Sequence, residues 1–175
     1  MERILFLGLG YIGLPTAALA ASRGLEVVGV DVDPAIVGKV NRGEIHIVEP
    51  GLAEAVREAV SAGRLRASLE PVPGDVYVVV VPTPFKGNHE PDVSYVEAAT
   101  RSVVPLLKED DLFVIESTSP VGTTDRMARL IFAERPELEG KLSVAYCPER
   151  VLPGNVLYEL VHNCLLYTSD AADDT

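Results

Sequence analysis

Short runs of apolar residues alternate along the chain with longer segments of helix-forming residues. The runs are rich in valine, isoleucine and leucine and lack strict alternation with polar residues, which is typical of strands buried on both faces of a sheet. Several of the longer segments end at a glycine, which suits a helix C-terminus. The pattern predicts strands at 4–7, 26–31, 65–67, 75–81, 111–116 and 142–146, and helices at 12–23, 34–41, 52–62, 94–107 and 123–135.

Strands that alternate with helices predict an α/β fold: a doubly wound parallel sheet with helices on both faces. We expect Ser94, and Thr123 or Thr124, to cap the helices that begin there, and residues 85–92 to form a turn-rich loop. In such a sheet the loops that follow the strands meet at one edge, and ligands bind at that edge.

The first apolar run leads directly into glycines spaced G-x-G-x-x-G. In a strand–turn–helix unit Gly8 permits the tight turn, Gly10 lets the backbone approach a pyrophosphate, and Gly13 lets the helix pack on the strand. Tyr11 and Ile12 complete the turn, and the helix N-terminus that follows offers free N–H groups to an anion. The predicted ligand is a dinucleotide.

The second apolar run ends at Asp31, about twenty residues beyond the glycines, where dinucleotide-binding units carry an acid. A carboxylate there hydrogen-bonds the ribose 2′-hydroxyl and repels a 2′-phosphate, so Asp31, with Asp33 behind it, predicts NAD rather than NADP. The alternative is an ordinary glycine turn followed by solvated acids. The strand–turn–helix context favours the Rossmann-like interpretation.

Composition predicts one globular domain, since 47% of the 175 residues are hydrophobic and 23% are charged. With 15 basic and 26 acidic side chains and no lysine or arginine cluster, we expect no nucleic-acid partner. The start of the chain lacks the features of a signal peptide and the apolar runs are too short to span a bilayer, so we expect a soluble, cytoplasmic protein with no membrane partner. Cys147 and Cys164 show neither metal-ligand spacing nor a disulfide pattern, and no metal site is expected.

Short motifs occur in order along most of the chain: Gly-Leu-Gly-Tyr-Ile-Gly-Leu-Pro at 8–15, Val-Asp-Val-Asp at 30–33, Glu-Pro-Gly-Leu at 49–52, Val-Pro-Thr-Pro at 81–84, Glu-Ser-Thr at 116–118 and Cys-Pro-Glu-Arg at 147–150. Together they resemble the UDP-glucose/GDP-mannose dehydrogenase superfamily, and residues 1–163 are similar to its NAD-binding domain alone. The resemblance implies oxidation of a sugar C6 alcohol to a carboxylate in two NAD-dependent steps, through an aldehyde held on a cysteine. It also implies that the complete enzyme is a homo-oligomer.

The same resemblance assigns roles to single residues. The glycine turn and Asp31 would hold the adenosine half of NAD, and Thr83 would contact the cofactor. Thr118 matches a threonine that contacts the cofactor or positions water, although its hydroxyl could instead satisfy backbone groups. Glu149 matches an acid near the reacting carbon that acts as a base through a water, with an ion pair to Arg150 as the alternative. Thr118 and Glu149 are thus the candidate catalytic residues.

The substrate prediction rests on the segment Pro148-Glu-Arg-Val-Leu-Pro-Gly-Asn155. Family members that act on UDP-glucose usually carry a second glutamate here, in a Pro-Glu-Phe-Leu-x-Glu pattern that this chain lacks. The segment looks like the branch that oxidises UDP-N-acetyl-D-mannosamine, with UDP-N-acetylglucosamine and UDP-glucose as alternatives. A freestanding NAD-binding module that senses redox state is an alternative of another class. The β-hydroxyacid dehydrogenases share the fold, but their first turn usually reads Gly-x-Met-Gly.

Residues 164–175 resemble nothing in the family and are expected to be a non-native tail. The chain shows no match to the family's central helical and C-terminal domains, which supply a lysine, an asparagine and the cysteine nucleophile. We therefore expect it to bind NAD but to be inactive alone, and to associate nonspecifically through exposed apolar surface. His46 and His162 are expected at the surface or hydrogen-bonded, and Cys147 as a small buried hydrophobe.

Overall fold

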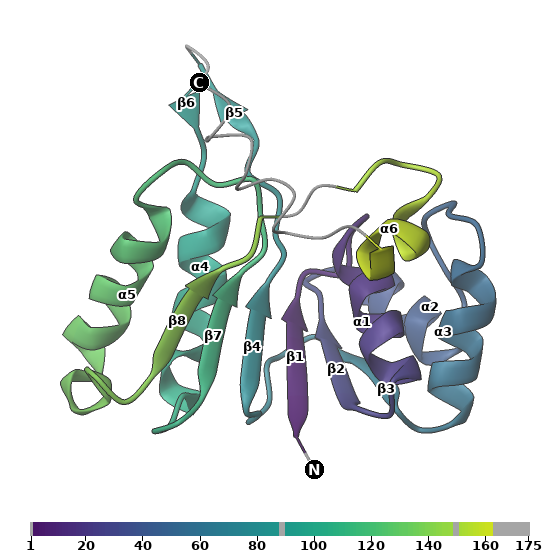
Figure 1. Ribbon diagram of the computed structural model, residues 1–175, viewed down its shortest axis with the longest axis horizontal. Coiled ribbons are helices and arrows are strands. Elements are labelled where there is room, and N and C mark those ends of the chain that lie inside the picture. Colours follow the sequence, from purple (N-terminus) through teal and green to yellow (C-terminus); the bar gives the residue numbers. More distant parts are fainter. Residues whose placement is uncertain (1, 88–89, 149–150, 163–175) are drawn as a thin grey trace.

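The computed structural model describes residues 2–87, 90–148 and 151–162. Its main feature is a six-stranded parallel sheet in the order β3-β2-β1-β4-β7-β8 (Figure 1). The strands are β1 Arg3–Leu7, β2 Glu26–Val30, β3 Leu65–Ser68, β4 Val76–Val79, β7 Leu112–Ile115 and β8 Ser143–Tyr146. The chain builds outwards from β1 to β3, returns to β4 beside β1, and continues the other way to β8. The order of the strands therefore reverses between β1 and β4, where open α/β sheets bind their ligands.

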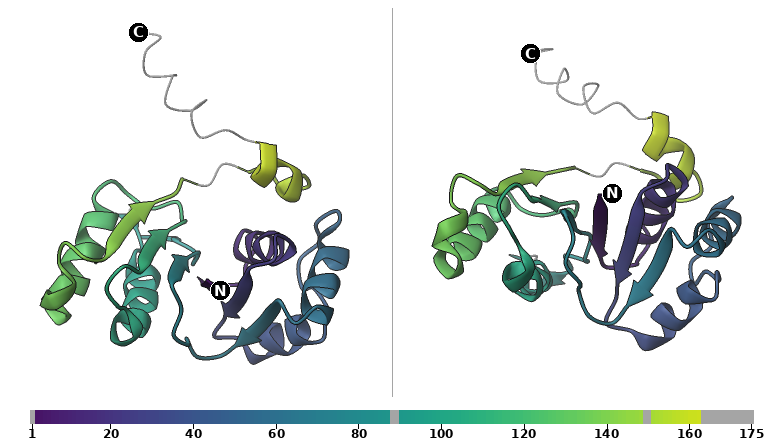
Figure 2. Two further views of the ribbon diagram at one scale, coloured as in Figure 1. Left: turned by 60° about the horizontal axis from the view of Figure 1, so that its bottom comes forward. Right: turned by 90° about the horizontal axis from the view of Figure 1, so that it is seen from below.

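Helices lie on both sides of this sheet (Figure 2). Three belong to the β1–β3 half, α1 Gly13–Ser22, α2 Pro34–Asn41 and α3 Leu52–Ser61, and two to the other half, α4 Ser94–Val103 and α5 Thr123–Glu134. Successive strand residues face opposite cores: Leu5 packs in the core of α4 and α5, and Phe6 in the core of α1 and α3. Because both faces are covered, the strands show no polar alternation, and the predicted α/β fold is confirmed.

The outer strand β3 is protected by α2, which contacts it. The Asn41 side chain at the end of α2 accepts a hydrogen bond from the Ala67 N–H (2.7 Å) and donates one to the Ala67 carbonyl (2.9 Å). The edge of the sheet thus keeps fewer free backbone groups that could pair with another strand.

Two features at the carboxyl ends of the strands were not expected from the sequence. A short antiparallel pair, β5 Phe85–Lys86 and β6 Glu90–Pro91, projects beyond the end of β4 where a loop was predicted (Figure 1). Helix α6, Val156–His162, packs against α1. Single-turn 3₁₀ helices, η1 Val104–Leu106 and η2 Pro136–Leu138, follow α4 and α5.

The capping predictions are wrong. Ser94 is the first residue of α4, and its N–H donates to the Asp92 carboxylate (2.9 Å), so Asp92 supplies the acceptor. Thr123 and Thr124 both lie inside α5, which begins after Gly122 in the left-handed conformation (φ 86°). Asp92 and Gly122 were as suitable as the residues chosen, and the geometry of each preceding loop decided between them.

No helix among residues 2–87, 90–148 and 151–162 is both long and apolar enough to cross a bilayer.

Candidate functional site

The glycine turn between β1 and α1 is tightly packed at two of its glycines and open at the third. Gly8 has φ 106°, and a Cβ there would lie 2.5 Å from the Val80 carbonyl oxygen. A Cβ on Gly13 would clash with the Gly8 carbonyl oxygen, so this glycine lets α1 start directly against the turn. A Cβ on Gly10, by contrast, would have no neighbour within 4 Å. The backbone at Gly10 therefore faces free space, as the approach of a pyrophosphate requires.

The Asp31 carboxylate lies against this turn. One oxygen accepts the Leu9 N–H and the other accepts the Asp33 N–H, both at 3.0 Å. Because an ionised carboxylate offers about four lone-pair positions, Asp31 keeps capacity for the hydroxyl donors of a ribose. Asp33 instead accepts the Ala35 N–H (2.8 Å) and caps α2, so its carboxylate already has a structural use.

Gly29 on β2 supports the glycine turn, and the sequence did not reveal this role. The Leu9 side chain is fully buried, and a Cβ on Gly29 would clash with it. The missing side chain on β2 makes room for Leu9, which carries the N–H that Asp31 accepts. A glycine inside a valine-rich strand is the signal that could have revealed it.

Thr83 and Thr118, predicted separately, are brought together. The Thr83 hydroxyl donates a hydrogen bond to the Thr118 carbonyl oxygen at 2.6 Å, which joins the loops that follow β4 and β7. Thr118 itself is exposed, whereas Glu116 and Ser117 before it are buried at the end of β7. Glu149, the other candidate catalytic residue, and its alternative partner Arg150 lie outside the described residues.

A buried carboxylate, Glu49, joins the glycine turn to the C-terminal segment. It is 5% exposed and accepts three hydrogen bonds: from the Tyr11 hydroxyl (2.7 Å), the Gly154 N–H (3.0 Å) and the Val156 N–H (2.7 Å). Burial acts to raise the pKa of Glu49, but the three donors outweigh it and hold the pKa below its usual value. The hydrogen bond to Glu49 in turn raises the pKa of Tyr11. Glu49 was quoted only as part of the Glu-Pro-Gly-Leu motif, and nothing in its sequence neighbourhood indicates this contact.

The remaining titratable residues show a mixed outcome. His162 is exposed and hydrogen-bonded through Nδ1 to the Tyr158 carbonyl oxygen (2.7 Å), as predicted. His46 is partly exposed, and its Nδ1 atom is buried and has no hydrogen-bond partner among the described residues. Cys147 is half-buried rather than buried. In the described part of the chain, no three histidine, cysteine, aspartate or glutamate side chains are placed to hold a metal ion.

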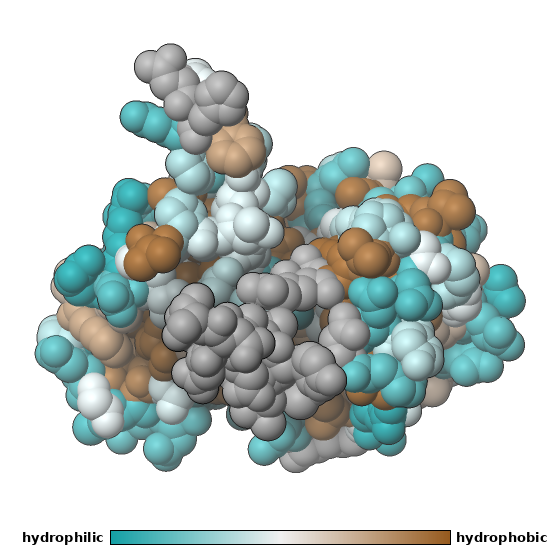
Figure 3. Space-filling view, turned by 45° about the horizontal axis from the view of Figure 1, so that its top comes forward, coloured by the Kyte–Doolittle hydropathy of each residue, from teal (hydrophilic) through white to brown (hydrophobic). Residues whose placement is uncertain are grey.

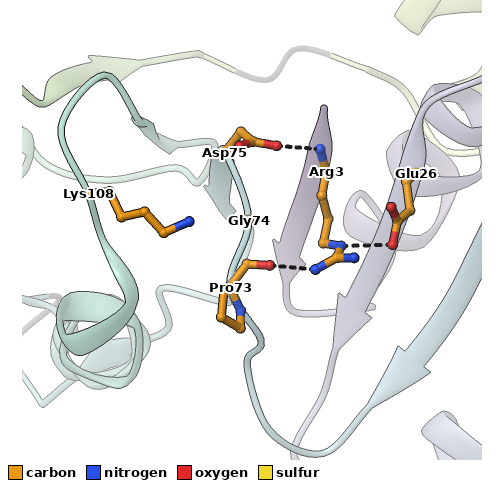
Figure 4. A pocket seen from close by; sticks show the side chains of 6 residues that line it. All are labelled: Arg3, Glu26, Pro73, Gly74, Asp75 and Lys108. Atoms are coloured by element: carbon orange, nitrogen blue, oxygen red, sulfur yellow. Dashed lines mark hydrogen bonds and ion pairs between the residues drawn. The ribbon is translucent and has the colours of Figure 1, made fainter. Parts of the chain in front are cut away.

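A depression lies at the opposite edge, around the amino ends of β1 and β4 (Figure 4). Its polar groups largely satisfy one another: the Arg3 guanidinium donates to Glu26 (2.8 Å) and to the Pro73 carbonyl (3.0 Å), and Asp75 accepts the Arg3 N–H (2.7 Å). Lys108 points into the hollow from the other side. None of the predicted site residues lines it.

Exposed apolar side chains are frequent in the loops at the carboxyl edge. Figure 3 turns this edge toward the reader and shows apolar patches among polar residues. The exposed apolar residues at this edge include Val32, Val48, Val121 and Leu152 in the loops and Phe85 in β5. These loops thus expose more apolar surface than loops that only contact solvent usually do.

Comparison with known proteins decides the family. The model of the UDP-glucose/GDP-mannose dehydrogenase family, NAD binding domain, matches residues 2–165. The chain belongs to this family. NAD is therefore the cofactor of the domain, and the predicted resemblance is confirmed.

Relatives of known activity share this part of their sequence. The UDP-N-acetyl-D-mannosamine dehydrogenase of Escherichia coli strain K12 is 54% identical over 165 residues, which cover 90% of this chain and 39% of that protein. The NDP-N-acetyl-D-galactosaminuronic acid dehydrogenase of Ralstonia nicotianae is 55% identical over 164 residues, which cover 89% of this chain and 39% of the relative. The chain thus spans about two fifths of the length of the curated relatives it matches.

The fold agrees with a solved structure from the same family. The UDP-N-acetyl-mannosamine dehydrogenase from Staphylococcus aureus superposes with a TM-score of 0.88 at 39% identity, covering 93% of this chain and 40% of that one.

Proposed function

We propose that the chain is the NAD-binding part of a nucleotide-sugar 6-dehydrogenase that oxidises the C6 alcohol of UDP-N-acetyl-D-mannosamine to the carboxylate with two NAD. The observation that carries the proposal is the meeting of the glycine turn and Asp31 at the point where the strand order reverses. The substrate is supported by the segment 148–155 and by the 54% identity to the Escherichia coli relative. A cytoplasmic, homo-oligomeric complete enzyme belongs to the same proposal and rests on the family resemblance.

The residues present fit NAD. The open space at Gly10 and the N–H groups at the start of α1 suit the pyrophosphate, and the spare lone pairs of Asp31 suit the ribose hydroxyls. A bound NAD would supply the acceptor for the hydride that leaves C6. The chain's own residues would bind and orient the NAD. Asp31 disfavours a 2′-phosphate by its charge, and Thr83 joins two of the loops at this edge through its hydrogen bond to Thr118.

The catalytic roles of Thr118 and Glu149 remain part of the proposal. Thr118 is exposed in the loop that follows β7, where a hydroxyl is accessible to the cofactor or to a water. Glu149 would take up a proton from the water that attacks the oxidised carbon.

Cofactor choice is tested on the chain itself by fluorescence titration with NADH and NADPH. We expect NADH to bind more tightly, and Asp31→Asn to raise the relative affinity for NADPH by about tenfold or more, because a like-charge repulsion is removed. Asp33→Asn is the matched control: it removes the same charge two residues away, and asparagine also caps a helix well. Tighter binding of NADPH by the unaltered chain would overturn the cofactor assignment.

Substrate choice is tested by joining residues 1–163 to the remaining part of the Escherichia coli relative and following NADH formation. We expect turnover with UDP-N-acetyl-D-mannosamine to exceed that with UDP-N-acetylglucosamine and UDP-glucose, and no turnover by the chain alone. Oxidation of UDP-glucose but of neither N-acetylated sugar would contradict the proposed substrate. If the joined protein binds NADH but oxidises none of the three sugars, the redox-sensing module is favoured instead.

A further inference from the structure

Glu49 has no part in the proposed function, yet its buried carboxylate accepts three hydrogen bonds at this edge. It lies in the loop between α2 and α3, and its three donors come from two distant parts of the chain. The Tyr11 hydroxyl belongs to the glycine turn, and the Gly154 and Val156 amides lie 105 and 107 residues further along the chain than Glu49.

The chemistry of the contact requires a carboxylate. All three partners are donors, and an ionised carboxylate only accepts. A neutral glutamine would place its NH₂ group against at least one N–H or O–H, so it could not satisfy the same set. Hydrogen bonds to a charged acceptor are also about twice as strong as neutral ones.

Apolar contacts also hold the segment 151–162 to the rest of the protein. Val156 is fully buried and Leu157 packs against the core that includes α1 and α3. Glu159 accepts the Leu152 N–H (2.7 Å), but that bond lies within the segment. Glu49 thus supplies a polar attachment between this segment and the glycine turn.

We propose that Glu49 is a positioning residue that couples the cofactor-binding turn to segment 151–162. The inference rests on the proposed function. A ligand that orders the turn also orders the Tyr11 hydroxyl, which orients the Glu49 carboxylate and so strengthens its hold on the Gly154 and Val156 amides. By linkage, the factor by which the ligand strengthens these hydrogen bonds equals the factor by which the hydrogen bonds strengthen ligand binding. Loss of the hydrogen bonds therefore weakens ligand binding by that factor. In the sequence, residues 147–150, which carry the candidate base Glu149, connect β8 to this segment.

The test follows amide exchange of residues 151–162 in the whole chain, with and without NADH, by mass spectrometry, together with NADH affinity by fluorescence. In the unaltered protein NADH is expected to slow exchange in the segment. Glu49→Gln is expected to abolish that slowing and to weaken NADH binding by about five- to tenfold, within the usual range of coupling between sites. Tyr11→Phe removes only the hydroxyl. It is expected to abolish the slowing and to weaken NADH binding as Glu49→Gln does, and the double variant is expected to differ little from Glu49→Gln.

Two controls separate coupling from simple support. Glu44→Gln removes an exposed carboxylate, paired with Arg42, from the same loop and is expected to change neither readout. Glu159→Gln loosens the segment internally and is expected to speed exchange while NADH still slows it. The ¹³Cζ resonance of Tyr11, assigned by its absence in Tyr11→Phe, should shift on NADH binding in the unaltered protein and respond differently in Glu49→Gln.

The outcomes are distinct. If Tyr11→Phe leaves both NADH affinity and the NADH-dependent slowing unchanged, Glu49 only supports the segment and the coupling is overturned. If the unaltered chain binds no NADH, the proposed function fails. The coupling is then judged by exchange without ligand, where Tyr11→Phe must speed exchange of the segment for the proposal to stand.

Discussion

The two edges of the sheet both carry charged and polar groups, yet they differ in how much hydrogen-bonding capacity those groups keep free. At the amino edge, Arg3 is engaged by Glu26, Pro73 and Asp75 around a visible hollow (Figure 4). At the carboxyl edge, Asp31 keeps unused acceptor positions and lies beside the glycine turn. A binding site is marked by unsatisfied hydrogen-bonding capacity next to open backbone, and a hollow in which Arg3, Glu26 and Asp75 already bond to one another meets that description less well.

Glycines show the same difference. A Cβ on Gly74, at the amino edge, would clash with the buried Leu5 side chain, whereas one on Gly10 would meet nothing within 4 Å. Glycine is therefore needed for packing at Gly74 and is unnecessary for packing at Gly10. We propose that the space at Gly10 admits a ligand that approaches the backbone there.

The largest expected effect comes from closing the turn itself. Gly13→Ala puts a Cβ into the Gly8 carbonyl oxygen, and two backbone segments cannot yield as a flexible side chain can. We expect the free energy of unfolding to fall by about 3 kcal/mol. Urea denaturation followed by circular dichroism measures it. A loss below about 0.5 kcal/mol would show that the turn relaxes and that Gly13 is not required for packing.

Gly10→Ala should separate binding from stability. With no neighbour near the new Cβ, the free energy of unfolding is expected to stay within about 0.5 kcal/mol of the unaltered value. NADH affinity is expected to fall by about tenfold, or about 1.4 kcal/mol, because the methyl group occupies the pyrophosphate's approach. Gly74→Ala is the matched change at the amino edge and should do the reverse, lowering stability without changing the affinity of the folded protein. Equal NADH affinity for Gly10→Ala and the unaltered chain would contradict the assigned role of Gly10.

This contrast also explains what the sequence could predict. The G-x-G-x-x-G spacing and Asp31 are local signals, because a turn and the residue at the end of the next strand are close in any βαβ unit. The six main strands and most helices were predictable from the apolar runs because these runs are local signals as well. The starts of two helices were less predictable, because Val93 and Gly122, rather than Ser94 and Thr123, occupy the capping positions of α4 and α5.

The contacts that the sequence could not reveal join distant segments. Glu49 meets Gly154 and Val156 across more than a hundred residues, and no spacing rule relates them. The β5–β6 pair escaped prediction because each strand has only two residues, too few to show alternation.

A smaller effect is expected at low pH, at the base of the β5–β6 pair. The Lys86 ammonium and the Ser94 hydroxyl and N–H lower the pKa of Asp92 from 3.8 to about 2. A carboxylate with a lowered pKa contributes stability that is fully present above pH 3.8 and is lost as the pH falls toward 2. Asp92→Asn should therefore be less stable than the unaltered chain at pH 5, and the difference should shrink steadily toward pH 2.

Urea midpoints measured between pH 5 and pH 2 give this difference directly, since the other carboxylates titrate alike in both proteins. Lys86→Gln is the companion variant, because it removes the largest cause of the lowered pKa and should leave a smaller acid-dependent loss. A gap between Asp92→Asn and the unaltered chain that stays constant over this range would refute the lowered pKa.

The smallest effect is expected at the amino edge, and it completes the comparison. Arg3→Gln breaks an ion pair that is about one-third exposed, so we expect a loss of at most about 1 kcal/mol of unfolding free energy. Lys108→Gln should change stability less, and neither variant should alter NADH affinity, because the hollow they line faces away from the strand ends that hold Gly10 and Asp31. Screening by 0.5 M salt should reduce the Arg3→Gln effect further, as it does for exposed pairs. If either variant weakened NADH binding as much as Gly10→Ala does, the ligand would belong to the depression in Figure 4, and the site would have been assigned to the wrong edge.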